Sequence, residues 1–258
     1  KRIVFFTYGV ACHVLFLITF ALLAGFVSND GIPQTIDAPA PKCSPAAAIG
    51  VDLLLLLAFA VQHSVMARPA FKRLWTKIVP SPIERSTYVL ISSLVTMLLI
   101  WQWRPIPAVI WHINHSLGWW IAVVMMAAGW LAVPAVSLMI NHFDLFGTRQ
   151  VWLYLQGKEY TSLAFRTPLA YAWVRHPLYV GWGLAFWMTP TMSAGHLLFA
   201  SVLTGYMALA ALVEERDLLA HYGQTYHDYR HRVPMFFPAL PLRRPAHAKQ
   251  RKLAETLS

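Results

Sequence analysis

Long apolar runs with few charged residues dominate this sequence, and they leave few folds open to it. They cover residues 3–27, 46–66, 87–103, 117–140, 178–190 and 194–213. A helix needs about 20 residues, at a rise of 1.5 Å each, to cross a bilayer. The first four runs meet that length, whereas 178–190 is too short unless it is extended or tilted. We therefore expect an all-α integral membrane protein with about five to six transmembrane helices.

The composition excludes an ordinary soluble domain. Hydrophobic residues make up 57% of the chain and charged residues 12%, about half the charged fraction of a typical soluble protein. The net charge of +10 could indicate nucleic-acid binding, but the basic residues lie in the gaps between apolar runs. That arrangement is typical of the cytoplasmic face of a membrane protein, so we expect a lipid bilayer as partner and no nucleic acid.

The distribution of Lys and Arg predicts the orientation of the chain. Gaps rich in basic residues follow the second and fourth runs, and gaps poor in them follow the first, third and fifth. Because basic loops stay in the cytoplasm, this alternation predicts a multi-pass protein with both termini cytoplasmic. It also favours two separate crossings for 178–190 and 194–213. Pro190, Ser193 and Gly195 break the chain between them, which predicts a C-terminal helical hairpin.

Residues with chemical capacity gather in two segments that follow apolar runs, 141–181 and 214–238. The first ends in Arg175, His176, Pro177, Tyr179 and Gly181. Pro177 suits the first turn of a helix, whose free N–H groups favour an anionic group. Gly181 would allow a ligand to approach closely. A purely structural alternative is equally open, in which Arg175 anchors the membrane face and His176 and Pro177 merely start a helix.

The second segment begins with Glu214 and Glu215 directly after an apolar run. Two carboxylates there are costly if they face lipid. They either project into water or face a polar cavity, where one accepts hydrogen bonds from ribose hydroxyls or an ammonium group. Gly223 then ends the helix, and a short interfacial helix carrying Tyr226 and Arg230 should follow and stop at Pro234.

The ordered pattern Arg175-His176-Pro177-x-Tyr179-x-Gly181, a hydrophobic hairpin, Glu214-Glu215-x-x-Leu218, Tyr222-Gly223-x-x-Tyr226-x-x-Tyr229 and Val233-Pro234 resembles the isoprenylcysteine carboxyl methyltransferase family. The resemblance covers about a quarter of the chain. It implies S-adenosylmethionine as cofactor, with S-adenosylhomocysteine as product, and cofactor-binding segments at the cytoplasmic face. Carried over by position, the cofactor-binding residues would be Arg175, His176, Pro177, Tyr179, Gly181, Glu214, Glu215, Tyr226 and Arg230.

A second resemblance extends over most of the chain. The stretches 62–69 (QHSVMARP), 84–88 (ERSTY), 141–147 (NHFDLFG) and 149–150 (RQ) are similar to bacterial methanethiol S-methyltransferases. This implies a small apolar thiol as substrate, dimethyl sulfide as product and the bacterial inner membrane as location. It also implies a four-helix transmembrane region over 1–140, a methyltransferase core over 141–238 and a polar tail over 239–258. No metal is implied, and the oligomeric state stays open.

Attack by a thiol requires loss of its proton, so a base or a cation should lie near the acceptor. His142 could accept that proton while Asp144 orients it, and Arg149 or Arg166 could stabilise the thiolate. Each of these side chains could instead serve as a supporting hydrogen-bond partner or a membrane anchor.

Three other functions stay open on the sequence alone. The acceptor could be lipophilic, such as a prenylated cysteine carboxylate or a phospholipid headgroup, which would need a lateral opening between helices. A transporter is disfavoured because the chain has no internal repeat and few ionisable residues within its runs. A haem-binding or structural membrane protein is disfavoured because most of the 11 histidines lie near the inner face.

Overall fold

The computed structural model describes residues 1–39 and 43–238, so the predicted tail 239–258 lies outside the described residues. Within the described part, five helices are long and apolar enough to cross a membrane. They are α1 (Arg2–Ser28), α2 (Pro45–Ala67), α4 (Ser81–Gln102), α5 (Ser116–Ile140) and α9 (Ala194–Tyr222). The prediction of an all-α integral membrane protein is confirmed.

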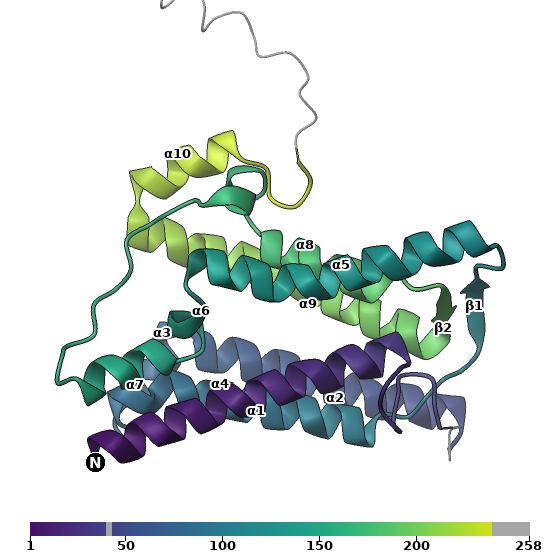
Figure 1. The fold of residues 1–258 in the computed structure, drawn as a ribbon, viewed down its shortest axis with the longest axis horizontal. Coiled ribbons are helices and arrows are strands. Elements are labelled where there is room, and N and C mark those ends of the chain that lie inside the picture. The colour runs from purple at the N-terminus through teal and green to yellow at the C-terminus, as the bar shows by residue number, and fades with distance from the viewer. Residues whose placement is uncertain (40–42, 239–258) are drawn as a thin grey trace, which may run out of the picture.

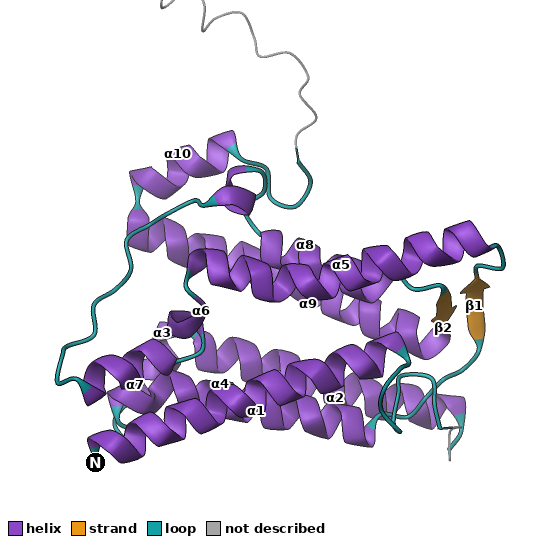
Figure 2. Cartoon of the chain, viewed as in Figure 1, coloured by secondary structure: helices purple, strands orange, loops and turns teal. Residues whose placement is uncertain are grey.

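Shorter elements lie between and after these spans. They are α3 (Pro69–Trp75), α6 (His142–Leu145), α7 (Thr148–Leu155), the 3-10 turn η1 (Leu169–Ala172), α8 (Pro177–Trp187) and α10 (Gln224–Arg232). In the described part of the chain, strands occur only as the pair β1 (Val109–His112) and β2 (Thr191–Ser193), drawn in orange in Figure 2.

The helices form two layers (Figure 1). Helices α1, α2 and α4 pack together in one layer, and α5, α8 and α9 pack together in the other. Contacts between α2 and α9 join the layers. The predicted division at residue 140 therefore separates segments that pack together in space, because α5 lies before it and its closest partner α8 after it.

Helix α8 confirms the predicted hairpin but is shorter than a span. Its 11 residues rise only about 16 Å. Residues 188–193 continue in irregular and extended form to β2, which pairs antiparallel with β1 in the connection between α4 and α5. Extended chain covers about 3.3 Å per residue, so helix and extension together reach the opposite end of the molecule. Because α8 breaks early, the carbonyl of Phe186 lacks a helical partner and accepts a hydrogen bond from His196 Nε2 at 2.8 Å.

Two glycines bring α5 and α8 unusually close. A Cβ added to Gly129 would lie 2.4 Å from the backbone nitrogen of Ala185 and 2.8 Å from the carbonyl oxygen of Gly181. A Cβ added to Gly181 would meet Ala132 and the backbone of Gly129 at 3.3–3.4 Å. The close approach that Gly181 permits in this structure is thus that of a neighbouring helix, and its contact with a cofactor stays a prediction.

Gly129→Ala is therefore expected to lower the thermal stability of the detergent-solubilised protein. The added methyl group strikes backbone atoms that cannot rotate away, and overpacking of this kind costs about 1–3 kcal/mol. Gly183→Ala is the matched control, since a Cβ there meets no atom within 4 Å. Equal melting temperatures for the two variants would contradict this account of α5–α8 packing.

Candidate functional site

The start of α8 is held by the segment that follows α10. Pro177 occupies the first turn of α8 and His176 is its N-cap residue, as the sequence predicts. The backbone N–H groups of Arg175 and His176 donate to the carbonyls of Pro234 and Met235 at 2.9 and 3.1 Å. These bonds fix both side chains at the point where α8, α9 and α10 meet.

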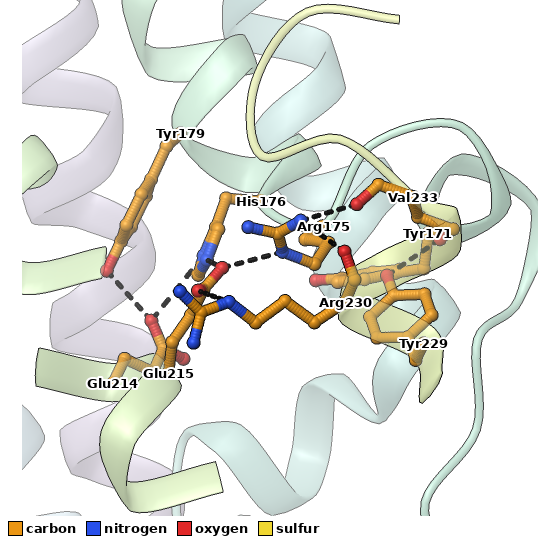
Figure 3. Close-up of polar contacts among 9 residues, drawn as sticks. All are labelled: Tyr171, Arg175, His176, Tyr179, Glu214, Glu215, Tyr229, Arg230 and Val233. Carbon is orange, nitrogen blue, oxygen red and sulfur yellow. Dashed lines mark hydrogen bonds and ion pairs between the residues drawn. The ribbon is translucent and has the colours of Figure 1, made fainter. Parts of the chain in front are cut away.

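Glu215 on α9 is the centre of a buried ionic cluster at this point (Figure 3). Its side chain is 3% exposed, and its Oε1 accepts from Arg175 Nε at 2.6 Å and from His176 Nε2 at 3.2 Å. Arg230 Nε of α10 lies 3.3 Å from Oε2. Arg175 also donates to the carbonyls of Val233 and Arg230. A buried carboxylate with three cationic or ring N–H neighbours links α8, α9 and α10 into one unit.

Glu214 is the open carboxylate of the pair. Its side chain is 49% exposed, and its Oε2 accepts from the hydroxyl of Tyr179 at 3.1 Å and lies 3.8 Å from His176 Nδ1. The His176 imidazole thus lies between Glu214 and Glu215, and the Tyr179 ring stacks on it with centroids 5.3 Å apart and planes at 11°. A solvent-facing carboxylate beside two stacked rings is the part of the cluster best placed to receive a ligand.

The two tyrosines of α10 anchor that helix. Tyr226 is almost fully buried and packs against Phe165, and the Tyr229 hydroxyl donates to the carbonyl of Tyr171 at 2.7 Å. Burial raises the pKa of Tyr229 to about 12 and raises that of Tyr226 as well, so both phenols stay protonated at neutral pH. Tyr226 therefore holds Arg230 in place through α10, and its contact with a cofactor stays a prediction.

The cluster is electrically balanced. Arg175 and Arg230 supply two positive charges, and Glu214 and Glu215 supply two negative ones. Carboxylates accept hydrogen bonds from hydroxyl and ammonium groups, and guanidinium groups bind carboxylates. Within residues 1–39 and 43–238, no group of three His, Cys, Asp or Glu side chains is arranged to hold a metal ion.

A second polar cluster surrounds His142, just after α5. Its Nδ1 lies 2.7 Å from Ser137 Oγ, and its Nε2 lies 3.1 Å from Nε2 of His13 in α1. His13 Nδ1 lies 2.7 Å from Thr148 Oγ1. His13 lies within the apolar run 3–27 and was not predicted as a site residue. The one signal in the sequence was a polar ring among hydrophobic neighbours.

Asp144 does not orient His142, contrary to the prediction. Its carboxylate accepts from Arg149 Nη1 at 2.9 Å, from the hydroxyl of Tyr160 at 3.3 Å and from Gln150. Both ring nitrogens of His142 are already engaged by Ser137 and His13, so no position remains for a carboxylate. The spacing of two residues at the start of α6 turns the two side chains toward different partners.

The two predicted arginines differ in environment. Arg149 is neutralised by Asp144 and also donates to the carbonyl and hydroxyl of Thr161. Arg166 is exposed and forms no hydrogen bond or ion pair with any residue in the described ranges. Their role as thiolate-stabilising groups stays a prediction.

An aromatic row joins the two polar clusters. His13 contacts Phe16, Phe16 contacts Phe20, and Phe20 contacts Trp182, with ring centroids 6.2, 6.2 and 5.8 Å apart. Trp182 lies one turn after Tyr179 on α8. Helices α6, α7 and α10 lie at the same end of the molecule, on the left in Figure 1. The site thus consists of the ionic cluster around Glu215 and a histidine cluster, with aromatic side chains between them. The histidine cluster comprises His13, Ser137, His142 and Thr148.

Curated relatives match nearly the whole chain. The sequence is 51% identical over 231 residues to the methanethiol S-methyltransferase of Crocosphaera subtropica, covering 90% of each chain. It is 50% identical over 238 residues to that of Mycobacterium tuberculosis, covering 92% of this chain and 97% of the relative. A Nurim homolog of Drosophila pseudoobscura is 32% identical over 190 residues, covering 70% and 74%.

No family model and no solved structure matches the chain. The fold and the ionic cluster, taken with the curated relatives, define a multi-pass membrane methyltransferase. The chain belongs to the methanethiol S-methyltransferase family.

Proposed function

We propose that this protein transfers a methyl group from S-adenosylmethionine to methanethiol, giving dimethyl sulfide and S-adenosylhomocysteine. The observation that carries the proposal is the cluster in which Glu214, His176 and Tyr179 meet at the ends of α8 and α9. The methanethiol S-methyltransferase relatives, which match over more than 90% of the chain in some cases, supply the substrate class.

The residues of the ionic cluster fit this cofactor. The exposed Glu214 carboxylate suits the ribose hydroxyls or the ammonium group, and the half-exposed Arg230 suits the carboxylate of the methionine part. The stacked His176 and Tyr179 rings offer an aromatic face to the adenine or to the positive sulfur. The buried Glu215 fixes the arginines and His176 in position. When bound, the sulfonium supplies a methyl carbon that is already activated for in-line displacement.

The chain itself contributes alignment, exclusion of water and removal of the thiol proton. The aromatic row of Phe16, Phe20 and Trp182 provides apolar surroundings for a small thiol. We assign proton removal to the cluster that contains His142. Burial lowers the pKa of His142 below its ordinary value of 6.5, so its ring is neutral at pH 7 and the cluster has capacity for a proton.

This assignment predicts the pH dependence of kcat/KM for methanethiol. A histidine cluster that must be neutral gives a profile that falls only as the pH drops below 6.5, because burial lowers the pKa of His142. The profile should be flat from there toward the thiol pKa of about 10, since the reactive form is neutral histidine plus protonated thiol. His13 is the titratable group in hydrogen-bond contact with His142. A tenfold rise per pH unit across the neutral range would instead show that free thiolate binds without a base.

One experiment tests the reaction. Purified protein is incubated with methyl-labelled S-adenosylmethionine and either methanethiol, a prenylcysteine analogue or phospholipid vesicles, and label is counted in each product. We expect label in dimethyl sulfide alone. A lipophilic acceptor remains the second candidate because an apolar groove of about 400 Å³ opens between α2 and α9, lined by Val61, Val65, Tyr206, Leu209 and Val213. Label in the prenyl or lipid product would favour that function.

We also propose that the protein lies in the bacterial inner membrane with both termini in the cytoplasm. The basic gaps after α2 and α5 lie at the same end as the ionic cluster, which suits a cytosolic cofactor. Reporter fusions at each terminus test the orientation, and an extracytoplasmic signal from either one would contradict it.

A further inference from the structure

The histidine cluster is a chain of four hydrogen bonds that draws on α1, α5, α6 and α7. Thr148 Oγ1 lies 2.7 Å from His13 Nδ1, and His13 Nε2 lies 3.1 Å from His142 Nε2. His142 Nδ1 lies 2.7 Å from Ser137 Oγ, and the Ser137 hydroxyl donates to the carbonyl of Pro134 at 2.8 Å. His13 is 8% exposed, so this chain of hydrogen bonds is buried where it passes α1.

The carbonyl at the end of this chain fixes its direction. A carbonyl only accepts, so the single hydroxyl proton of Ser137 goes to Pro134 and Ser137 must accept from His142 Nδ1–H. A neutral imidazole carries one N–H, which leaves His142 Nε2 as an acceptor for His13 Nε2–H. His13 Nδ1 then accepts the proton of the Thr148 hydroxyl. All four donors therefore point the same way.

This direction decides which member can take up a proton. Both nitrogens of His142 are occupied, one as donor to Ser137 and one as acceptor from His13. Both nitrogens of His13 are likewise occupied. Within the described residues, unused lone pairs of this network remain on two hydroxyl oxygens. The one on Ser137 is buried, since that residue is 2% exposed. Those of Thr148 lie at the first turn of α7, at the same end of the molecule as the ionic cluster.

We propose that Thr148, His13 and His142 form a proton relay for methyl transfer, in which Thr148 is the entry and His13 holds the proton. The proposal rests on the proposed function. The S–H bond of the thiol breaks and its proton goes to Thr148 Oγ1, while the proton of Thr148 moves to His13 Nδ1. The sulfur electron pair forms the new S–C bond, and the donor's S–C bond breaks with its electron pair kept by the donor sulfur.

The relay is then left with one positive charge. The His13 imidazolium donates through Nδ1 to Thr148 and through Nε2 to His142, whose lone pair stabilises the charge. Loss of this proton to water restores the starting arrangement. His142 is thus a positioning residue that acts through His13.

The test compares Thr148→Val with Thr148→Ser. Valine keeps the shape of threonine and removes the hydroxyl, whereas serine keeps the hydroxyl. For each variant, kcat/KM is measured with methanethiol and with a fluorinated alkyl thiol whose proton is much easier to lose. With methanethiol, Thr148→Val should lose at least ~100-fold, the range of general base catalysis, and with the acidic thiol less than ~10-fold. Thr148→Ser, which keeps the hydroxyl, should restore most of the activity with methanethiol that Thr148→Val loses.

His13→Phe is the second variant and should show the same dependence on thiol acidity. Binding of S-adenosylhomocysteine, measured by calorimetry, should be unchanged in all variants, which shows that they are folded. Equal losses with the two thiols, or full activity of Thr148→Val, would overturn the relay while leaving the proposed function intact. A wild-type protein that binds S-adenosylhomocysteine but methylates neither thiol would overturn the proposed function itself.

Discussion

Glu215→Gln is expected to weaken S-adenosylhomocysteine binding at least ~100-fold and to lower methyl transfer in parallel. The buried carboxylate accepts from Arg175 and His176 and lies 3.3 Å from Arg230. Removing one partner of a buried ion pair costs about 3–5 kcal/mol, because the remaining charges are left unpaired, and 3 kcal/mol already corresponds to more than 100-fold. The substitution keeps the shape of the side chain, so the effect reports the charge.

Calorimetry with S-adenosylhomocysteine measures the first effect, and transfer of labelled methyl groups measures the second. Asp228→Asn is the matched control, because it removes a carboxylate from α10, the helix that carries Arg230, but an exposed one. It should bind and react like the wild type. Equal behaviour of the two variants would mean that Glu215 does not organise the cofactor site.

His142→Phe is expected to lower kcat by ~10²- to 10⁴-fold while S-adenosylhomocysteine still binds. Phenylalanine fills the ring position but cannot accept the hydrogen bond from His13 or donate to Ser137. His13 then loses the lone pair that stabilises its imidazolium, so uptake of the thiol proton is disfavoured, whereas the ionic cluster with Glu215 on α9 is untouched. This separation of binding from turnover is the signature of a group that acts in the chemical step.

The control is His227→Phe, which changes an exposed histidine on α10. Single-turnover measurements should show no loss for this variant. If His142→Phe reacted at the wild-type rate, the histidine cluster would have no part in proton removal.

The ends of the site helices could be predicted from local signals. Pro177 begins α8, Gly223 has a φ of +55° and ends α9, and Pro234 follows α10. Those signals place Arg175 and His176 before α8 and Glu214 within the last turns of α9. The family resemblance, and not the helix ends, named the residues that gather there, and their contact with a cofactor stays a prediction. The structure adds that Glu215 is the buried centre of the cluster and that Glu214 is its solvent-exposed carboxylate. Two identical neighbouring residues give no sequence signal for this difference.

The histidine cluster could not be predicted in the same way. His13 lies in the middle of α1, 129 residues from His142, so only tertiary packing brings the two rings together. The pairing of His142 with Asp144 was wrong because the short helix α6 directs them apart, and Arg149 supplies a nearer partner for the carboxylate. Contacts of this kind depend on side-chain direction in the folded chain.

The residue at which α8 ends could not be predicted from the sequence pattern either. The run 178–190 is apolar throughout, yet the helix ends at Trp187 and the chain continues as β2. The strand is fixed by pairing with β1, whose residues belong to a connection about 80 residues earlier. Register between distant segments has no local signal in either segment.

A structure of the protein with S-adenosylhomocysteine bound would test the central claim most directly. The nucleoside should lie against the stacked His176 and Tyr179 rings, with a hydroxyl or ammonium group hydrogen-bonded to the Glu214 carboxylate. Its sulfur should face the aromatic row that leads to His13. A ligand found in the groove between α2 and α9, or at any position away from Glu214 and His176, would contradict the account.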